Sequence, residues 1–273
     1  MLILFIRDFF GQLEFEDKEY WDDLKSGKKK TPVPIYILGP VNTDQKWLFP
    51  DLEGCELATD IIYLGSVGLL TTSQGLSLAY ISPNVDFEKI KSLEVRTKCN
   101  LEGFQGVDIL LSSDWPNGIG SPDNEVKPTD GDPMISRLAV KLLPRYHFSG
   151  QRNVFYERVP YRNHRVMVQT QKHVTRFIGM AKVGNAEKRK WIYAFNINPM
   201  KHMARSELIA QPPSASDIPY SQSNLSKVNN NFFTLEYTLI AEIEFTKVWK
   251  KSVKSPSTKL QCKMFSRKIG KIP

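Results

Sequence analysis

Histidine and cysteine are scarce in this chain of 273 residues. There are four histidines, none of them in the first 146 residues, and three cysteines, which form no CxxC pair. So few cysteines, in odd number, do not make a disulfide framework and are typical of a reducing, intracellular compartment. All four histidines fall between residues 145 and 205, so a metal centre that draws histidines from several parts of a fold is disfavoured.

Long apolar runs and the common catalytic motifs are also missing. No apolar stretch approaches the roughly 18 residues that span a membrane, and the apolar start of the chain has no basic flank like that of a signal peptide. The motifs GxSxG, HExxH, GxGxxG and the P-loop do not occur. The sequence therefore predicts neither a membrane protein nor one of the familiar hydrolases or dinucleotide enzymes.

Basic charge is present in excess and is unevenly placed. Residues 145–205 hold 13 Lys or Arg and only two acids, Glu157 and Glu187, while the net charge of the whole chain is +8. Residues 214–273 add ten Lys or Arg against four acids. Such asymmetry indicates a polyanionic partner, although charge alone says nothing about the fold.

Short apolar runs bounded by Gly and Pro alternate with helical patterns over the first 144 residues, which predicts an α/β fold with a partly parallel sheet. The predicted strands are 2–6, 33–38, 61–64, 76–81 and 107–111, and the predicted helices are 17–25, 85–100 and 133–142. Beyond residue 144 we expect antiparallel strands at 165–169, 175–182 and 190–198, a turn at 183–188, and a short helix at 204–210.

The composition changes near residue 213. Residues 213–230 are rich in Ser, Pro and Asn, which predicts a linker. Residues 232–246 alternate between apolar and polar in the manner of a strand, and the rest is Lys-rich without periodicity. We therefore expect a domain at 1–212, a linker at 213–230 and an irregular basic tail at 231–273.

Oxygen and amide ligands follow three of the predicted strands. Asp8 follows the first, Asn42 the second, and Asp114 the strand at 107–111. Two-metal hydrolases place their ligands on such loops, so a metal-dependent RNA phosphodiesterase using these three residues is one hypothesis. Loop capping and turn formation explain the same residues without a metal.

The basic stretch interleaves arginines with aromatic residues. Guanidinium groups suit phosphates, and aromatic rings offer stacking surfaces for unpaired bases. The alternative is that the aromatic rings belong to the core while the arginine heads reach a solvated face. The candidate nucleic-acid or partner-binding residues are Arg145, His147, Arg152, Arg158, Tyr161, Arg162, Arg165 and Arg176.

Several segments of the chain resemble the CwfJ family of Cwf-nineteen-like proteins. The resemblance covers about residues 1–220. It is carried by PRYHF at 144–148, YERVPYRNH at 156–164, AKVGN at 181–185, YAF at 193–195, PMK at 199–201, GCELA at 54–58, YLG at 63–65 and GVDILL at 106–111.

The resemblance implies a mixed-sheet sandwich similar to the metallophosphoesterase fold, truncated here at its first strand. It also implies nuclear residence and a role in intron lariat debranching and turnover. The implied partners are the lariat-debranching enzyme and late spliceosome components, with RNA as a further candidate, and no membrane or cofactor is expected. Residues 226–273 resemble nothing in the family, so a truncated product without independent function is an alternative.

The resemblance also implies that catalysis is absent. When the metal-ligand motifs of the active debranching enzymes are aligned with this chain, the ligand positions fall near Asp8, at Gly39–Val41 beside Asn42, at Ser113 before Asp114, and at Gln151 and Asn153. Only Asp8 keeps a ligand type, so the six residues Asp8, Asn42, Ser113, Asp114, Gln151 and Asn153 are expected to be vestigial. The expected protein is a non-catalytic relative of metallophosphoesterases.

Overall fold

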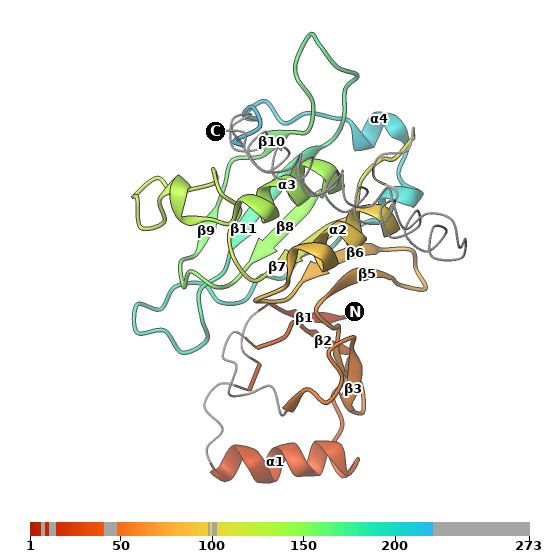
Figure 1. The fold of residues 1–273 in the computed structure, drawn as a ribbon, viewed down its shortest axis with the longest axis vertical. Helices are drawn as coiled ribbons and strands as arrows, with labels where there is room; N and C mark the ends of the chain where they lie inside the picture. Colours follow the sequence, from red (N-terminus) through yellow and green to blue (C-terminus); the bar gives the residue numbers. More distant parts are fainter. Residues whose placement is uncertain (7–8, 11–14, 41–47, 98, 100–102, 221–273) are drawn as a thin grey trace, which may run out of the picture. The chain divides into compact units, whose positions relative to one another are not determined.

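The strands in the described part of the chain form two mixed sheets (Figure 1). A computed structural model describes residues 1–6, 9–10, 15–40, 48–97, 99 and 103–220. Asp8, Asn42, the expected strand at 232–246 and the basic tail lie outside these described residues. None of the described helices is long and apolar enough to cross a membrane.

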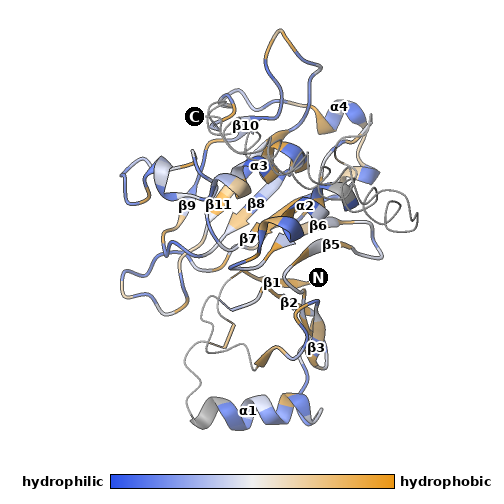
Figure 2. Cartoon of the chain, viewed as in Figure 1, coloured by the Kyte–Doolittle hydropathy of each residue, from blue (hydrophilic) through white to orange (hydrophobic). Residues whose placement is uncertain are grey.

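The smaller sheet has the strand order β1-β2-β4-β3. Its strands β1 (Ile3–Phe5), β2 (Ile35–Ile37) and β4 (Ile61–Tyr63) run parallel, and β3 (Cys55–Ala58) pairs antiparallel with β4. Helix α1 (Phe15–Lys25) lies in the chain between β1 and β2. It is largely hydrophilic (Figure 2), yet Trp21 and Leu24, three residues apart, bury one stripe in the same apolar cluster as Ile37 and Ile61.

The larger sheet has the strand order β10-β11-β8-β7-β6-β5, with β9 paired to β11. Its centre is parallel, because helices α2 (Phe87–Arg96) and α3 (Pro133–Leu142) make the crossovers between successive strands. The parallel strands are β6 (Ser77–Ile81), β7 (Ile109–Ser112), β8 (Tyr146–Ser149) and β11 (Val174–Gly179). The antiparallel strands are β5 (Val67–Thr71), β9 (Tyr156–Glu157) and β10 (Tyr161–Arg162).

The core lies on both faces of the larger sheet. All four residues of β7 are buried, as expected for a central parallel strand with both faces covered. On one face, Ile109 and Phe148 share an apolar cluster with Leu38 and Leu64 from the smaller sheet. On the other, α2 and α3 pack together and are joined by a largely buried ion pair between Glu94 Oε1 and Arg137 Nε, 2.8 Å apart.

The predicted α/β class and most predicted elements are confirmed. The expected strands before residue 144 correspond to β1, β2, β4, β6 and β7, the predicted helix at 133–142 is α3, and the short helix is α4 (Arg205–Leu208). The two mixed sheets do not form a barrel. The finer likeness to the metallophosphoesterase sandwich stays a prediction.

Two predicted strands are wrong. Residues 165–169 form a turn closed by the bond from Gln169 N to Arg165 O, 3.0 Å long. Residues 190–198 are assigned to no strand, although Tyr193, Phe195 and Ile197 do pack against the core. They also line a cleft of about 2020 Å³, to which β1 contributes as well.

Residues 213–220 pack onto the described unit, although the sequence predicts a linker there. Ser216 N donates to Pro160 O at 2.8 Å, and Arg162 N donates to Ser216 O at 2.9 Å. Tyr220 is buried, and its hydroxyl lies 2.9 Å from that of Tyr161. The first eight residues of the predicted linker therefore belong to the fold. Their polar composition predicted a linker because it does not show that Tyr220 is buried against Tyr161.

Candidate functional site

The carboxyl ends of β7 and β8 bring several of the predicted site residues together. Ser113 and Asp114 follow β7, and Gln151 to Asn153 follow β8. The backbone N–H groups of Gly150 and Gln151 both donate to Ser113 O, at 3.3 and 2.8 Å. Ends of parallel strands are the usual place for a site in an open α/β sheet, so this edge is the first place to test for chemistry.

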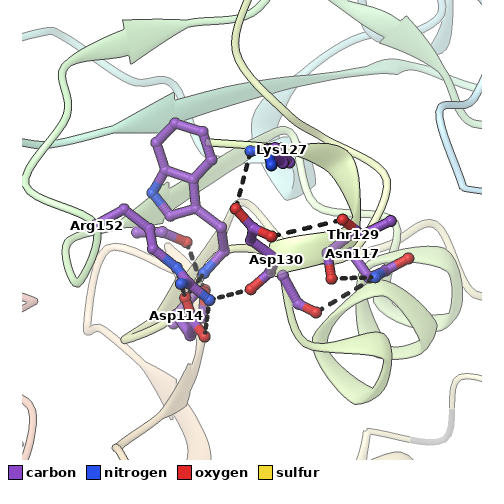
Figure 3. A network of polar contacts seen from close by, with 10 residues as sticks. Asp114, Asn117, Lys127, Thr129, Asp130 and Arg152 are labelled. Atoms are coloured by element: carbon purple, nitrogen blue, oxygen red, sulfur yellow. Dashed lines mark hydrogen bonds and ion pairs between the residues drawn. The ribbon is translucent and has the colours of Figure 1, made fainter. Parts of the chain in front are cut away.

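The carboxylate of Asp114 is held by the guanidinium group of Arg152 (Figure 3). Arg152 Nε donates to one oxygen and Nη2 to the other, each over 2.7 Å, and Nη2 also donates to Asp130 O. The backbone N–H of Trp115 donates to Asp114 Oδ1 at 2.7 Å as well. Such a two-point pair fixes the carboxylate geometrically and satisfies its charge, so a cation would have to displace Arg152.

The loop beside this pair is organised by further polar contacts (Figure 3). Asp130 accepts from Lys127 N, and Asn117 Nδ2 donates to Thr129 O at 3.3 Å. Asp132 caps α3 by accepting from Met134 N at 2.7 Å. Burial, with a smaller contribution from nearby Asp114, raises the pKa of Asp132. The loop thus connects the end of β7 to the start of α3.

A buried polar cluster lies behind this edge. Ser112 Oγ lies 2.8 Å from His147 Nε2 and 2.6 Å from Ser149 Oγ, and both serine hydroxyls donate to Asp114 O. His147 has no exposed surface, and burial lowers its pKa to about 3. Its imidazole is therefore neutral at physiological pH, and the ring packs edge-on against Phe177. Because it is neutral and inaccessible, His147 is removed from the predicted binding surface.

Metal-ligating side chains do not gather elsewhere in the described part of the chain, which contains no group of three or more His, Cys, Asp or Glu suited to a metal ion. Ser113 is buried, and its hydroxyl has no hydrogen-bond partner. Asn153 accepts from Lys182 N at 2.9 Å and has a left-handed backbone with φ of 57°. The positions predicted as vestigial therefore act in loop structure where they are described.

Three of the predicted surface arginines hold the fold together. Arg145 pairs with buried Asp108, and Arg162 pairs with Asp217, each over 3.3 Å. Arg158 Nη1 donates to Ser216 Oγ at 2.8 Å, which holds residues 213–220 against the sheet. Each of these contacts uses only part of a guanidinium group. The arginines therefore stabilise the fold and still leave part of their side chains exposed.

Tyr161 is unavailable to any partner. It has no exposed surface, and burial raises its pKa to about 12. Arg165 is exposed, whereas Arg176 is half-buried and lies over the ring of Tyr146, 5.7 Å from its centroid. The accessible part of the predicted surface therefore comes from arginines and not from Tyr161 or His147.

Sequence reasoning missed two contributors to this region. Lys190 Nζ lies 4.3 Å from the ring centroid of Tyr193 and 5.1 Å from that of Phe155, which adds a cation–π cluster beside β9. Asp108 is buried and accepts from Ser77, Arg145 and the backbone of Met200. The only sign of this buried contact in the sequence is that Asp108, an acid, stands at the start of an apolar strand.

The fold and this edge define a mixed α/β protein in which the guanidinium group of Arg152 is paired with the carboxylate of Asp114 at the strand ends. No family model matches the chain. It is 44% identical over 236 residues to "CWF19-like protein 1" of Mus musculus, covering 81% of this chain and 43% of that protein. It is 42% identical over 237 residues to the human protein of the same name, covering 81% of this chain and 43% of that protein. It is also 42% identical over 246 residues to the Caenorhabditis elegans "CWF19-like protein 1 homolog", covering 83% of this chain and 45% of that protein.

The chain belongs to the CwfJ/CWF19-like family, which confirms the resemblance that the sequence motifs indicate. It spans less than half of the length of these relatives, at 43 to 45%.

Proposed function

We propose that this chain is a non-catalytic binding module that assists intron lariat debranching and turnover in pre-mRNA splicing. Membership of the CWF19-like family supports a splicing-related role. The proposed partners are the lariat-debranching enzyme and late spliceosome components, with RNA as a further partner, and the proposed location is the nucleus.

The observation that carries the non-catalytic part is the Asp114–Arg152 pair. A metal-dependent phosphodiesterase needs carboxylates free to bind a cation and to hold it next to a phosphate. Here both oxygens of Asp114 accept from a fixed guanidinium group at 2.7 Å. The cation's place next to Asp114 is thus taken by a permanent positive charge that cannot polarise water as a bound metal does.

The binding part is supported by the excess of positive charge near β10 and β11. No Asp or Glu occurs between residues 158 and 186, whereas six Lys or Arg do. Arg165 is exposed and has no described ion pair, and Arg176 is partly exposed with its guanidinium group over the ring of Tyr146. Single-stranded RNA that contacts such residues loses affinity steeply as salt rises, since each neutralised phosphate releases counterions.

The test compares Arg165→Glu/Arg176→Glu with Lys28→Glu, which reverses an exposed charge next to α1. We expect the double variant to weaken recovery of RNA or of the debranching enzyme by about tenfold or more, with a shallower salt dependence. The control variant should behave like the unmodified chain. Equal recovery by both variants, with both folded, would remove the basic surface from the proposal.

Catalysis is tested separately on the purified chain. We expect no Mn²⁺-dependent hydrolysis of branched or linear RNA. Hydrolysis that disappears in Asp114→Ala would overturn the non-catalytic proposal and establish the phosphodiesterase alternative. A chain that aggregates and shows no cooperative melting would instead support the view that this product has no independent function.

A further inference from the structure

The loop between β10 and β11 carries an apolar tip. Residues 163–173 form this loop, which rises above β10 in Figure 2 with apolar colouring at its end. Val166, Met167 and Val168 are 52%, 99% and 75% exposed. Scattered apolar residues on a surface are normal, but contiguous ones on a projecting element mark interaction sites. Val166, Met167 and Val168 together form the loop tip, a contiguous apolar surface.

The base of the loop is held by hydrogen bonds. Asn163 Nδ2 donates to Thr175 Oγ1 at 2.9 Å, and Gln211 Nε2 donates to Lys172 O at 2.7 Å. The turn itself is closed by two bonds between Arg165 and Gln169, one from each backbone N–H, at 2.9 and 3.0 Å. A preorganised element loses little conformational entropy when it binds, so this loop is suited to docking without rearrangement.

Met167 has a left-handed backbone, with φ of 65°. That region is unfavourable for an L-residue with a long side chain, and glycine or asparagine is the usual choice there. Strained positions of this kind persist where the surroundings fix them and are concentrated at functional sites. The strained backbone position therefore carries the most exposed apolar side chain of the loop.

The charges around the tip indicate what kind of surface it fits. Arg165 directly precedes the tip and Lys172 lies at the base of the loop; both are exposed, and no ion pair is described for either. No acid lies between residues 158 and 186. The tip itself offers neither an aromatic ring for base stacking nor a side-chain donor for phosphate, so RNA is a poor match for it.

We infer that the loop tip inserts into an apolar pocket with an acidic rim on a partner protein. The aliphatic side chains would fill the pocket, while Arg165 and Lys172 would face the rim carboxylates. This inference goes beyond the proposed function and does not depend on a role in debranching, because it rests on the shape, exposure and charge of this loop alone.

The first experiment places a benzophenone amino acid at position 167 of the full chain and irradiates it in cell extract. The protein that is crosslinked is identified, purified and measured for binding to unlabelled chain. We expect Met167→Gly to weaken this binding roughly 10- to 100-fold, since it removes a side chain that the complex would bury. Val168→Asp should weaken it at least as much.

The matched control is Lys188→Gly. Lys188 is also exposed and also left-handed, with φ of 54°, but it lies in a different turn. Both glycine substitutions should leave the melting temperature unchanged or slightly raised, because glycine relieves the backbone. Only the substitution at the tip should affect binding, and Lys188→Gly should stay within twofold of the unmodified chain.

Crosslinking at position 167 to RNA or lipid, or to nothing, overturns the inference. So does equal affinity of the identified protein for the unmodified chain and for Met167→Gly. If the tip binds its protein as expected while the chain has no effect on lariat debranching, the proposed function fails and this inference stands.

Discussion

Removing the guanidinium group of Arg152 should loosen the edge where β7 and β8 end. Arg152→Ala deletes two charge-assisted hydrogen bonds of 2.7 Å to Asp114 and one to Asp130 O. Hydrogen bonds to charged groups contribute about 1.5–3 kcal/mol each when buried. The two side chains are 31% and 26% exposed, so water recovers part of the loss, and we expect a net cost of about 2–3 kcal/mol.

Thermal and urea denaturation measure this cost. In a domain of this size about 1 kcal/mol lowers the melting temperature by roughly 2–4 °C, so the expected drop is about 4–12 °C. Arg189→Ala is the matched control, since Arg189 also makes a two-point pair, to Glu125 at 2.9 and 2.6 Å, together with an ion pair to Glu187 next to it in the same loop. The pair with Glu125 joins two exposed loops and does not link strand ends, so we expect less than about 1 kcal/mol there.

A double-mutant cycle isolates the pair itself. Asp114→Ala, Arg152→Ala and the double variant should give a coupling free energy above about 1 kcal/mol, as for residues in one hydrogen-bonded network. If Arg152→Ala melts within about 2 °C of the unmodified chain, or costs no more than Arg189→Ala, the pair does not organise this edge. Arg152 would then not be the group that closes this site to a cation.

Two further predictions follow from buried groups. Burial lowers the pKa of His147 to about 3 and that of His173 to about 4. Below a pH of about 6.5 the unfolded chain therefore takes up protons on these histidines, while the folded chain does not. The free energy of unfolding should fall as the pH drops. Each histidine should cost about 2 kcal/mol between pH 7 and pH 5 in urea titrations, and equal midpoints at the two pH values would contradict this. Gly179→Ala should destabilise the fold by about 1–3 kcal/mol, because its Cβ would lie 2.2 Å from Cζ2 of buried Trp115. Adding Trp115→Phe should restore part of that loss, and an additive double variant would argue against a steric cause.

Periodicity predicted the elements whose own sequence decides their burial. The run at 107–111 is apolar throughout because β7 is covered on both faces, and helix α3 begins at Pro133 after its cap Asp132, which the sequence displays directly. The alternation at 190–198 was also real, since Tyr193 and Phe195 face the core. It marks an extended backbone, but whether such a backbone pairs with a strand depends on what lies beside it, and this the sequence does not contain.

The candidate site depended far more on tertiary structure. Arg and aromatic residues alternate through the basic stretch, and both a solvated surface and a buried core produce that pattern. Strand β8 separates Tyr146 and Phe148 on one face from His147 on the other, and burial on both faces makes His147 neutral and inaccessible. The pairing of Asp114 with Arg152 joins residues 38 positions apart, so no local pattern could have revealed it.

By itself, the sequence determined the α/β class, the basic stretch and membership of a family, because these depend on local pattern, composition and motif. Only the tertiary structure decided which arginines are committed to ion pairs and which remain exposed. It also placed Arg152 on Asp114 and projected Val166–Val168 from the surface. The physical reason is that charge and hydrophobicity acquire a role only through what they contact, and those contacts are made between strands and loops distant in the chain.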